Sequence, residues 1–332
     1  MKPLIKKLVE IPSPSGYEAQ IRSVIRAEVE KDVDDLKVDA LGNLIARKGQ
    51  GSKGGLKVML SAHIDEIGII ATHVDKDGFV RFTTVGGVRP LNCVGGRVCF
   101  LNGKIGVIGA ERMEDTSQVP SVEQMFIDLG FASSKDASVK VGDIAAFERP
   151  FTDLGNRLVS KAMDDRIGVA VLIETLHQLK ETPHEVFFVF STQEEVGLRG
   201  ATTAAYGVNP DLGLAVDVTA SGDTPKGLKM EVGLGKGPAI KVRDGGMLSD
   251  PRVVDWMVRT AEKAKIPYQL EVLVGGTTDA RAIQVTRAGV PVGCVSIPTR
   301  YIHSPSEMVD FNDVQNSVRL LLSLLSQPVK LG

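Results

Sequence analysis

Two adjacent glutamates, Glu194 and Glu195, closely follow an apolar run at residues 186–190. That run predicts a buried strand, and the end of such a strand is where an α/β sheet presents ligand-binding residues. Successive side chains of an extended chain point to opposite faces, so neighbouring carboxylates meet different environments. One glutamate can therefore hold a metal ion while the other faces a substrate. The alternative is a solvated pair at the positive end of the next helix.

The chain has five histidines, and two of them follow predicted strands. His63 and Asp65 come after the apolar run at residues 56–60, and as alternate residues they share one face, so the aspartate can orient the imidazole or bind beside it. His303 lies just beyond the strand predicted at residues 290–297. For each histidine the alternative is a structural hydrogen bond at a strand end. No role is assigned to His73, His177 or His184.

Two further carboxylates occupy comparable positions. Asp164 precedes the apolar helix predicted at residues 167–176 and, taken alone, is typical of a helix N-cap. Asp217 ends the wholly apolar strand predicted at residues 212–216, where a carboxylate is costly unless it is paired or coordinating. The carboxyl ends of parallel strands meet at one edge of a sheet, so we expect the histidines, the glutamate pair and Asp217 to converge there.

Two imidazoles with several carboxylates and no thiolate suit two divalent ions such as Zn, Co or Mn. A carboxylate shared between ions about 3.5–4 Å apart, with a bridging water, supplies a nucleophile at neutral pH and polarises a carbonyl. One further carboxylate must then move protons. The pattern therefore predicts metal-dependent hydrolysis.

Composition limits the class of protein. The chain has 332 residues, 43% of them hydrophobic, and a formal net charge of −2. This length allows two domains, and no dense Lys/Arg block indicates nucleic-acid binding. Lysines interrupt the apolar residues of the first ten positions and no stretch reaches membrane-spanning length, so we expect a cytoplasmic protein without a membrane partner. The three cysteines lack zinc-finger spacing and are interpreted as core thiols.

The pattern of elements changes twice along the chain. Helices are predicted at residues 4–11 and 15–33, followed by a hairpin near residues 38–46. Residues 68–148 read as short strands punctuated by glycine, which predicts a small inserted all-β domain. The remainder alternates between helix and strand and predicts a mostly parallel sheet flanked by helices. The α/β domain would then be discontinuous, formed by residues 1–67 and 149–332.

Five segments of the chain resemble the motifs of a known family. They are residues 61–68 (SAHIDEIG), 161–168 (KAMDDRIG), 194–197 (EEVG), 215–217 (AVD) and 300–304 (RYIHS). Their types and order are similar to those of the M42 metallo-aminopeptidases, the TET family that includes glutamyl and deblocking aminopeptidases. The resemblance covers essentially the whole chain.

The resemblance implies a phosphorylase/hydrolase-like α/β domain that holds two divalent ions, with Zn or Co as the first candidates and Mn as the third. His63 and Asp217 would hold one ion, Glu195 and His303 the other, and Asp164 would bridge them. Glu194 would be the general base for attack by a metal-bridging hydroxide, and Asp65 would orient His63.

The implied activity is removal of the N-terminal residue from peptides with a free N-terminus. Members of the family dimerise through the inserted domain and often form hollow tetrahedral dodecamers, so we expect a homo-oligomer. Two alternatives remain: a related two-metal carboxypeptidase or deacylase, and a non-catalytic peptide-binding shell protein. The preferred N-terminal residue, the physiological ion and the choice between dimer and dodecamer stay open, and no role is assigned to the loop at residues 277–279.

Overall fold

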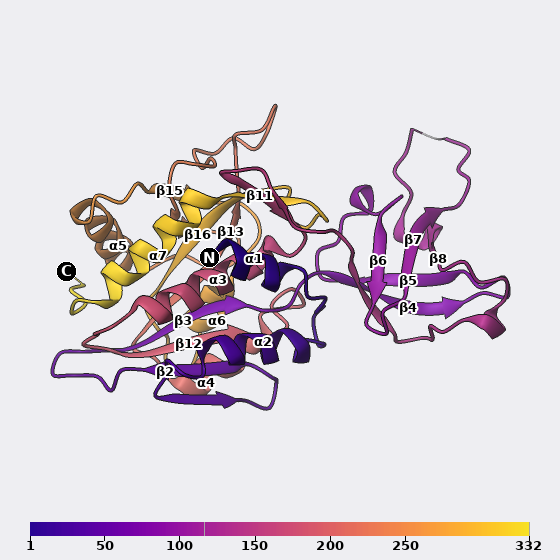
Figure 1. Cartoon of the computed structure of the whole chain (residues 1–332). Helices are drawn as coiled ribbons and strands as arrows, with labels where there is room; N and C mark the ends of the chain where they lie inside the picture. The colour runs from indigo at the N-terminus through magenta and orange to yellow at the C-terminus, as the bar shows by residue number, and fades with distance from the viewer. Residues whose placement is uncertain (116, 332) are drawn as a thin grey trace.

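The computed structural model describes residues 1–115 and 117–331, which form two lobes (Figure 1). The larger lobe is built on an 11-stranded sheet. Its strands are β1 (Asp35–Val38), β2 (Leu44–Lys48), β3 (Lys57–His63), β10 (Thr152–Asp153), β11 (Arg157–Ser160), β12 (Glu185–Ser191), β13 (Leu212–Ala220), β14 (Ala239–Arg243), β15 (Gln269–Val272), β16 (Val292–Arg300) and β17 (Glu307–Asp310).

Strand order is β1-β2-β12-β3-β13-β16-β17-β11-β10, with β14 pairing β16 and β15 pairing β14. Parallel pairing joins β12, β3, β13 and β16 at the centre, and β14 to β15. The other pairs are antiparallel, so the prediction of a mostly parallel sheet is correct only for the central strands and for β14 with β15. Connections such as residues 301–306 between β16 and β17 are too short for a crossover helix, and the chain returns antiparallel instead.

Helices cover both faces of this sheet. α1 (Lys2–Val9), α2 (Ala19–Val29), α3 (Met163–Gln178), α5 (Pro251–Lys263) and α7 (Phe311–Leu325) share one hydrophobic cluster with alternate strand residues such as Val58 and Leu60. α4 (Arg199–Val208) and α6 (Asp279–Gln284) pack on the opposite face, in a cluster that contains Met59. The alternation of β3 between the two clusters follows from the two-residue period of a strand. The sandwich of helices around a sheet was predicted, as was the β1–β2 hairpin.

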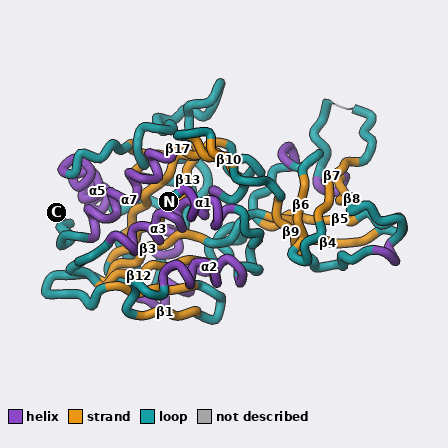
Figure 2. The backbone as a smooth tube through the Cα atoms, viewed as in Figure 1, coloured by secondary structure: helices purple, strands orange, loops and turns teal. Residues whose placement is uncertain are grey.

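The smaller lobe is a closed barrel in the order β4-β5-β8-β7-β6-β9. Figure 2 shows it as almost entirely strands and loops, whereas the long helices lie in the larger lobe. Its strands are β4 (Gly68–Val74), β5 (Val80–Val85), β6 (Arg97–Phe100), β7 (Ile105–Ala110), β8 (Met125–Asp128) and β9 (Ile144–Phe147), with 3-10 turns η1 (Pro90–Asn92), η2 (Val122–Gln124) and η3 (Ser134–Asp136). It has a hydrophobic core of its own, which includes Phe82, Val98 and Phe100.

The membrane-span, cysteine and helix-boundary predictions have different outcomes. Among the described residues, no helix has both the length and the hydropathy needed to cross a membrane. Cys93 and Cys294 are buried free thiols, as predicted, whereas Cys99 is only partly buried. Helix α2 begins at Ala19 rather than at Ser15, because the Ser15 hydroxyl donates to Asp65 instead of capping the helix.

Candidate metal centre

The residues predicted to converge lie at the carboxyl edge of the central strands. His63 is the last residue of β3, and Asp217 lies in β13 two positions beyond Ala215, which pairs with Ser61 of β3. Glu194 and Glu195 follow β12, whose Ser191 pairs with His63. His303 comes from the loop after β16, and Asp164 from the irregular first turn of α3. Residues far apart in the chain therefore meet because the sheet aligns the strand ends.

Asp164 contacts both histidines, one with each carboxylate oxygen. Its Oδ1 lies 2.9 Å from Nε2 of His63, and its Oδ2 lies 3.4 Å from Nε2 of His303. Asp217 Oδ1 lies 4.0 Å from the His63 nitrogen, and Glu195 Oε2 lies 3.2 Å from the His303 nitrogen. The result is two groups, His63–Asp164–Asp217 and Asp164–Glu195–His303, whose ligand atoms lie within 4.8 Å of one another in each group.

These two groups fit a pair of divalent ions. Each offers one imidazole nitrogen and two carboxylates, a nitrogen and oxygen donor set that suits Zn, Co or Mn. Glu195 Oε1 is buried and has no hydrogen-bond partner among the described residues. A buried carboxylate oxygen without a partner is costly, and a cation would satisfy it.

Electrostatics at the site point the same way. Burial opposes the charged form of both imidazoles, but the adjacent carboxylates outweigh it: contact with Asp164 and Glu195 raises the pKa of His303 to about 11. Contact with Asp164 and Asp65 raises the pKa of His63 well above its usual range. Burial also opposes ionisation of Asp164, yet the two histidines lower its pKa. The clustered carboxylates thus favour positive charge at both imidazoles, which is the environment that a bound cation would meet.

The two adjacent glutamates differ in their surroundings. The Glu195 side chain is 4% exposed and belongs to one of the ligand groups, whereas Glu194 is 12% exposed and belongs to neither. Glu194 Oε2 lies 3.9 Å from Nε2 of His63, and the residue lines a large cavity that opens over the site. Burial, with the nearby carboxylates of Asp217 and Glu195, raises the pKa of Glu194 well above its usual range. A carboxylate so placed can take up a proton beside the ligand groups.

Asp65 is completely buried and contacts His63 and the glutamate pair. Its backbone oxygen lies 3.1 Å from Nδ1 of His63, and its carboxylate Oδ1 lies 3.5 Å from the same nitrogen. The carboxylate also accepts hydrogen bonds from the backbone N–H groups of Glu194 and Glu195. It therefore orients an imidazole and the glutamate pair together.

Comparison with known proteins agrees with this geometry. A family model described as M42 glutamyl aminopeptidase matches residues 42–320. The chain belongs to this family.

Similar proteins match it almost end to end. The chain is 45% identical to a putative aminopeptidase of Acetivibrio thermocellus over 326 residues, and this alignment covers 97% of each protein. It matches the solved aminopeptidase APDkam598 from the archaeon Desulfurococcus kamchatkensis with a TM-score of 0.94 and 42% identity, over 98% of this chain and 94% of that one. The TET1 peptidase of Pyrococcus horikoshii, which can assemble into a tetrahedron or a large octahedral shell, matches with a TM-score of 0.88 and 35% identity, over 98% and 99% of the two chains. The protein is therefore a peptide hydrolase of the M42 family, and the non-catalytic alternative is not supported.

Two buried acids of this M42 chain were missed as site residues. Glu307 accepts hydrogen bonds from the backbone N–H groups of Asp164 and His303. Asp279 accepts bonds from the hydroxyls of Ser61 (2.6 Å) and Ser191 (2.5 Å), and so ties α6 to two strand ends. The signal for Glu307 was an acid that follows a candidate ligand by four residues and begins a strand, but strand β17 was not predicted.

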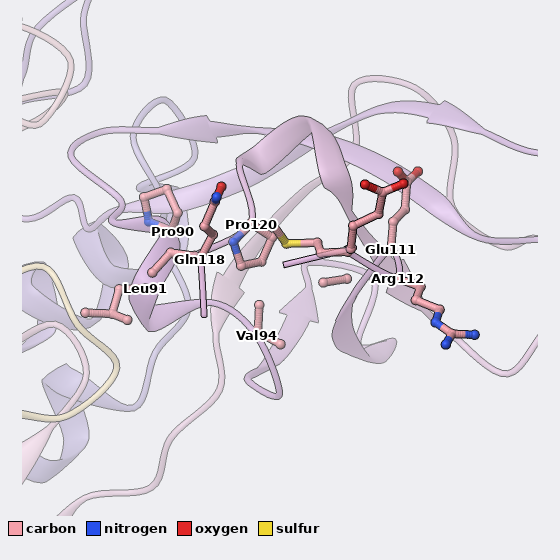
Figure 3. Close-up of a pocket in the computed structure, with 11 residues that line it drawn as sticks. Pro90, Leu91, Val94, Glu111, Arg112, Gln118 and Pro120 are labelled. Atoms are coloured by element: carbon pink, nitrogen blue, oxygen red, sulfur yellow. The ribbon is translucent and has the colours of Figure 1, made fainter. Parts of the chain in front are cut away.

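A cavity of about 1020 Å³ opens over the centre. His63, Asp164, Glu194, Glu195, Asp217 and His303 all line it. Gly87 and Arg89, from the loop that leaves β5 of the barrel, close one side, and Val272 and Val274 line another. A second cavity of about 840 Å³ lies on the barrel lobe, between Pro90, Val94, Glu111 and Pro120, and contains none of the predicted site residues (Figure 3).

Proposed function

We propose that this M42 peptidase is a two-metal aminopeptidase that removes the N-terminal residue of peptides. His63 and Asp217 would hold one ion, Glu195 and His303 the other, and Asp164 both. The observation that carries the proposal is that the two carboxylate oxygens of Asp164 face different imidazoles. Oδ1 lies 2.9 Å from Nε2 of His63, and Oδ2 lies 3.4 Å from Nε2 of His303. Bound ions would supply an activated water at neutral pH and polarise the scissile carbonyl.

Glu194 is the proposed general base. Its carboxylate accepts a proton from the attacking water as the new bond to the carbonyl carbon forms, and then donates that proton to the leaving amine as the peptide bond breaks. Its position outside both ligand groups and its raised pKa support this role. Asp65 holds Glu194 in place through the backbone N–H of that residue.

The substrate end of the proposal is tested with paired substrates. An aminopeptidase must hold the free amine of the N-terminal residue near the ions or a carboxylate. A free-amine dipeptide should therefore be cleaved on the order of 10²-fold faster than its N-acetylated analogue. Rates should be measured after loading with Zn, Co and Mn in turn. Equal cleavage of the acetylated peptide, or cleavage only at the carboxyl end, would favour the deacylase or carboxypeptidase alternative.

We further propose that the chain forms homo-oligomers, with a dimer as the building block of a tetrahedral dodecamer. The likeness to the Pyrococcus horikoshii TET1 peptidase supports this assembly. The barrel lobe is the proposed dimerisation domain, since it projects from the α/β lobe (Figure 1). Light scattering of the metal-loaded protein distinguishes twelve subunits from two.

A further inference from the structure

We propose that Glu307 is a positioning residue that holds two ligands of the metal centre at a set separation. The inference rests on the proposed two-metal function, and Glu307 itself belongs to neither ligand group. Its carboxylate joins the residue shared by both ions, Asp164, to a residue of the second group, His303.

The hydrogen bonds are direct and buried. Glu307 Oε2 accepts from the backbone N–H of Asp164 at 3.0 Å, and Oε1 accepts from the backbone N–H of His303 at 2.8 Å. Only 2% of Glu307 is exposed. Each oxygen thus serves a different segment of the chain, and the two segments meet at one side chain.

The sheet places Glu307 between the two ligand-bearing segments. It is the first residue of β17, which pairs with β11 on one side and with β16 on the other. Glu307 pairs directly with Ser160, at the end of the strand that leads to Asp164, and its neighbour Met308 pairs with Arg300, which leads to His303.

The backbone conformation of both residues is irregular. Asp164 has non-helical backbone angles (φ −75°, ψ 106°) within the first turn of α3, and His303 has φ 60°, which a non-glycine residue rarely adopts. The backbone N–H groups at these irregular positions therefore depend on a side-chain acceptor. Glu307 supplies both acceptors, so its loss would alter the separation of Asp164 Oδ2 and His303 Nε2.

A carboxylate is required because both of its oxygens accept. Glu307→Gln keeps the shape but turns one acceptor into an N–H donor, which would face another N–H. Asp313 offers a matched control in the same lobe: it is buried, and its two oxygens accept from the backbone N–H groups of Gly235 (2.6 Å) and Gly237 (2.7 Å). Asp313→Asn makes the same chemical change at a carboxylate that holds no ligand.

The test is metal binding by the stripped full-length protein. Zn or Co is titrated into wild type, Glu307→Gln and Asp313→Asn, and the dissociation constant of each ion and the thermal midpoint are measured. We expect Glu307→Gln to bind ions about 10- to 100-fold more weakly, with the larger loss at the site that contains both Asp164 and His303. Asp313→Asn should lower the thermal midpoint while leaving both dissociation constants unchanged.

Wild-type affinity in Glu307→Gln, or an equal loss in Asp313→Asn, would overturn the inference and leave the proposed function intact. A wild-type protein that binds no ion would overturn both. If Glu307→Gln does not fold, Glu307→Asp gives the same test, since it keeps the charge but withdraws the carboxylate by one methylene; wild-type affinity in that variant would again contradict the positioning role.

Discussion

Asp65 Oδ1 accepts a hydrogen bond from the backbone N–H of Glu194 at 3.0 Å. Its Oδ2 accepts from the backbone N–H of Glu195 at 3.2 Å and from the hydroxyl of Ser15 at 2.6 Å. The same aspartate contacts Nδ1 of His63 through its backbone oxygen. One buried aspartate thus connects the proposed base with a proposed ligand of each ion.

This connection predicts the effect of Asp65→Asn. The amide loses one of the acceptors for the glutamate N–H groups and the charge beside His63, so turnover should fall about 10- to 100-fold. Ser15→Ala is the control, since it removes only the hydroxyl bond and should cost less. Steady-state rates and metal content measured on both variants decide the matter; an Asp65→Asn enzyme as active as Ser15→Ala would contradict the role.

Asp164→Asn should abolish binding of both ions. An amide is a poorer ligand than a carboxylate, and this residue is shared by the two groups. Asp165→Asn is a close control, because Asp165 lies in neither ligand group and an amide oxygen can still accept the hydrogen bond that the backbone N–H of Gly168 donates. Metal analysis of the purified variants tests bridging, and full retention of two ions by Asp164→Asn would exclude it.

Gly87→Ala should damage the centre from the barrel side. A Cβ at this position would collide with Nδ1 of the His303 ring, so the imidazole must move. A misplaced catalytic group of this kind can cost about 10²-fold in kcat/KM. Gly207→Ala, at an exposed helical site where a Cβ meets nothing within 4 Å, should leave activity unchanged. Equal activity of the two variants would show that the loop does not confine His303.

Metal affinity should rise with pH. The carboxylates of Asp164 and Glu195 raise the pKa of His303 from 6.5 to about 11, whereas a ligating imidazole must be neutral, so metal binding near neutral pH should release a proton from this residue. Each released proton makes the affinity about tenfold higher per pH unit. Calorimetric titrations in buffers of different ionisation enthalpy measure the release, and metal binding without any proton release near pH 7 would contradict it.

The same raised pKa of His303 contributes to the pH dependence of the stability of the protein without bound metal. The folded pKa of His303 lies above its ordinary value of 6.5, so the contacts with Asp164 and Glu195 stabilise the fold fully below about pH 6.5. This contribution is lost as pH rises through about 11. The free energy of unfolding of His303→Gln and wild type, both stripped of metal, should therefore converge at alkaline pH.

The ligand candidates other than Asp164 could be selected from sequence because each one follows or ends an apolar strand. An acid or histidine at such a position has few inexpensive structural explanations, and the rules of α/β sheets bring strand ends together. The separate roles of Glu194 and Glu195 could not be selected in the same way. The two-residue period of a strand requires that they differ, but only the family resemblance assigned the roles.

The outer strands and the supporting contacts could not be read from the sequence. Strand β17 is four residues long and follows an irregular loop, so its first residue, Glu307, gave no periodic signal. The contact of Gly87 with His303 depends on how the barrel sits against the α/β lobe. Antiparallel pairing of β17 and β11 at the sheet edge likewise depends on tertiary packing rather than on local pattern.

The central claim is that Glu194 moves protons while Glu195 holds metal, and Glu194→Gln tests it most directly against Glu195→Gln. Kcat and bound metal should be measured for both variants and wild type. We expect Glu194→Gln to lose on the order of 10²–10⁴-fold in kcat with both ions retained, and Glu195→Gln to lose metal. A Glu194→Gln protein that loses its ions together with its activity would contradict the division of the pair.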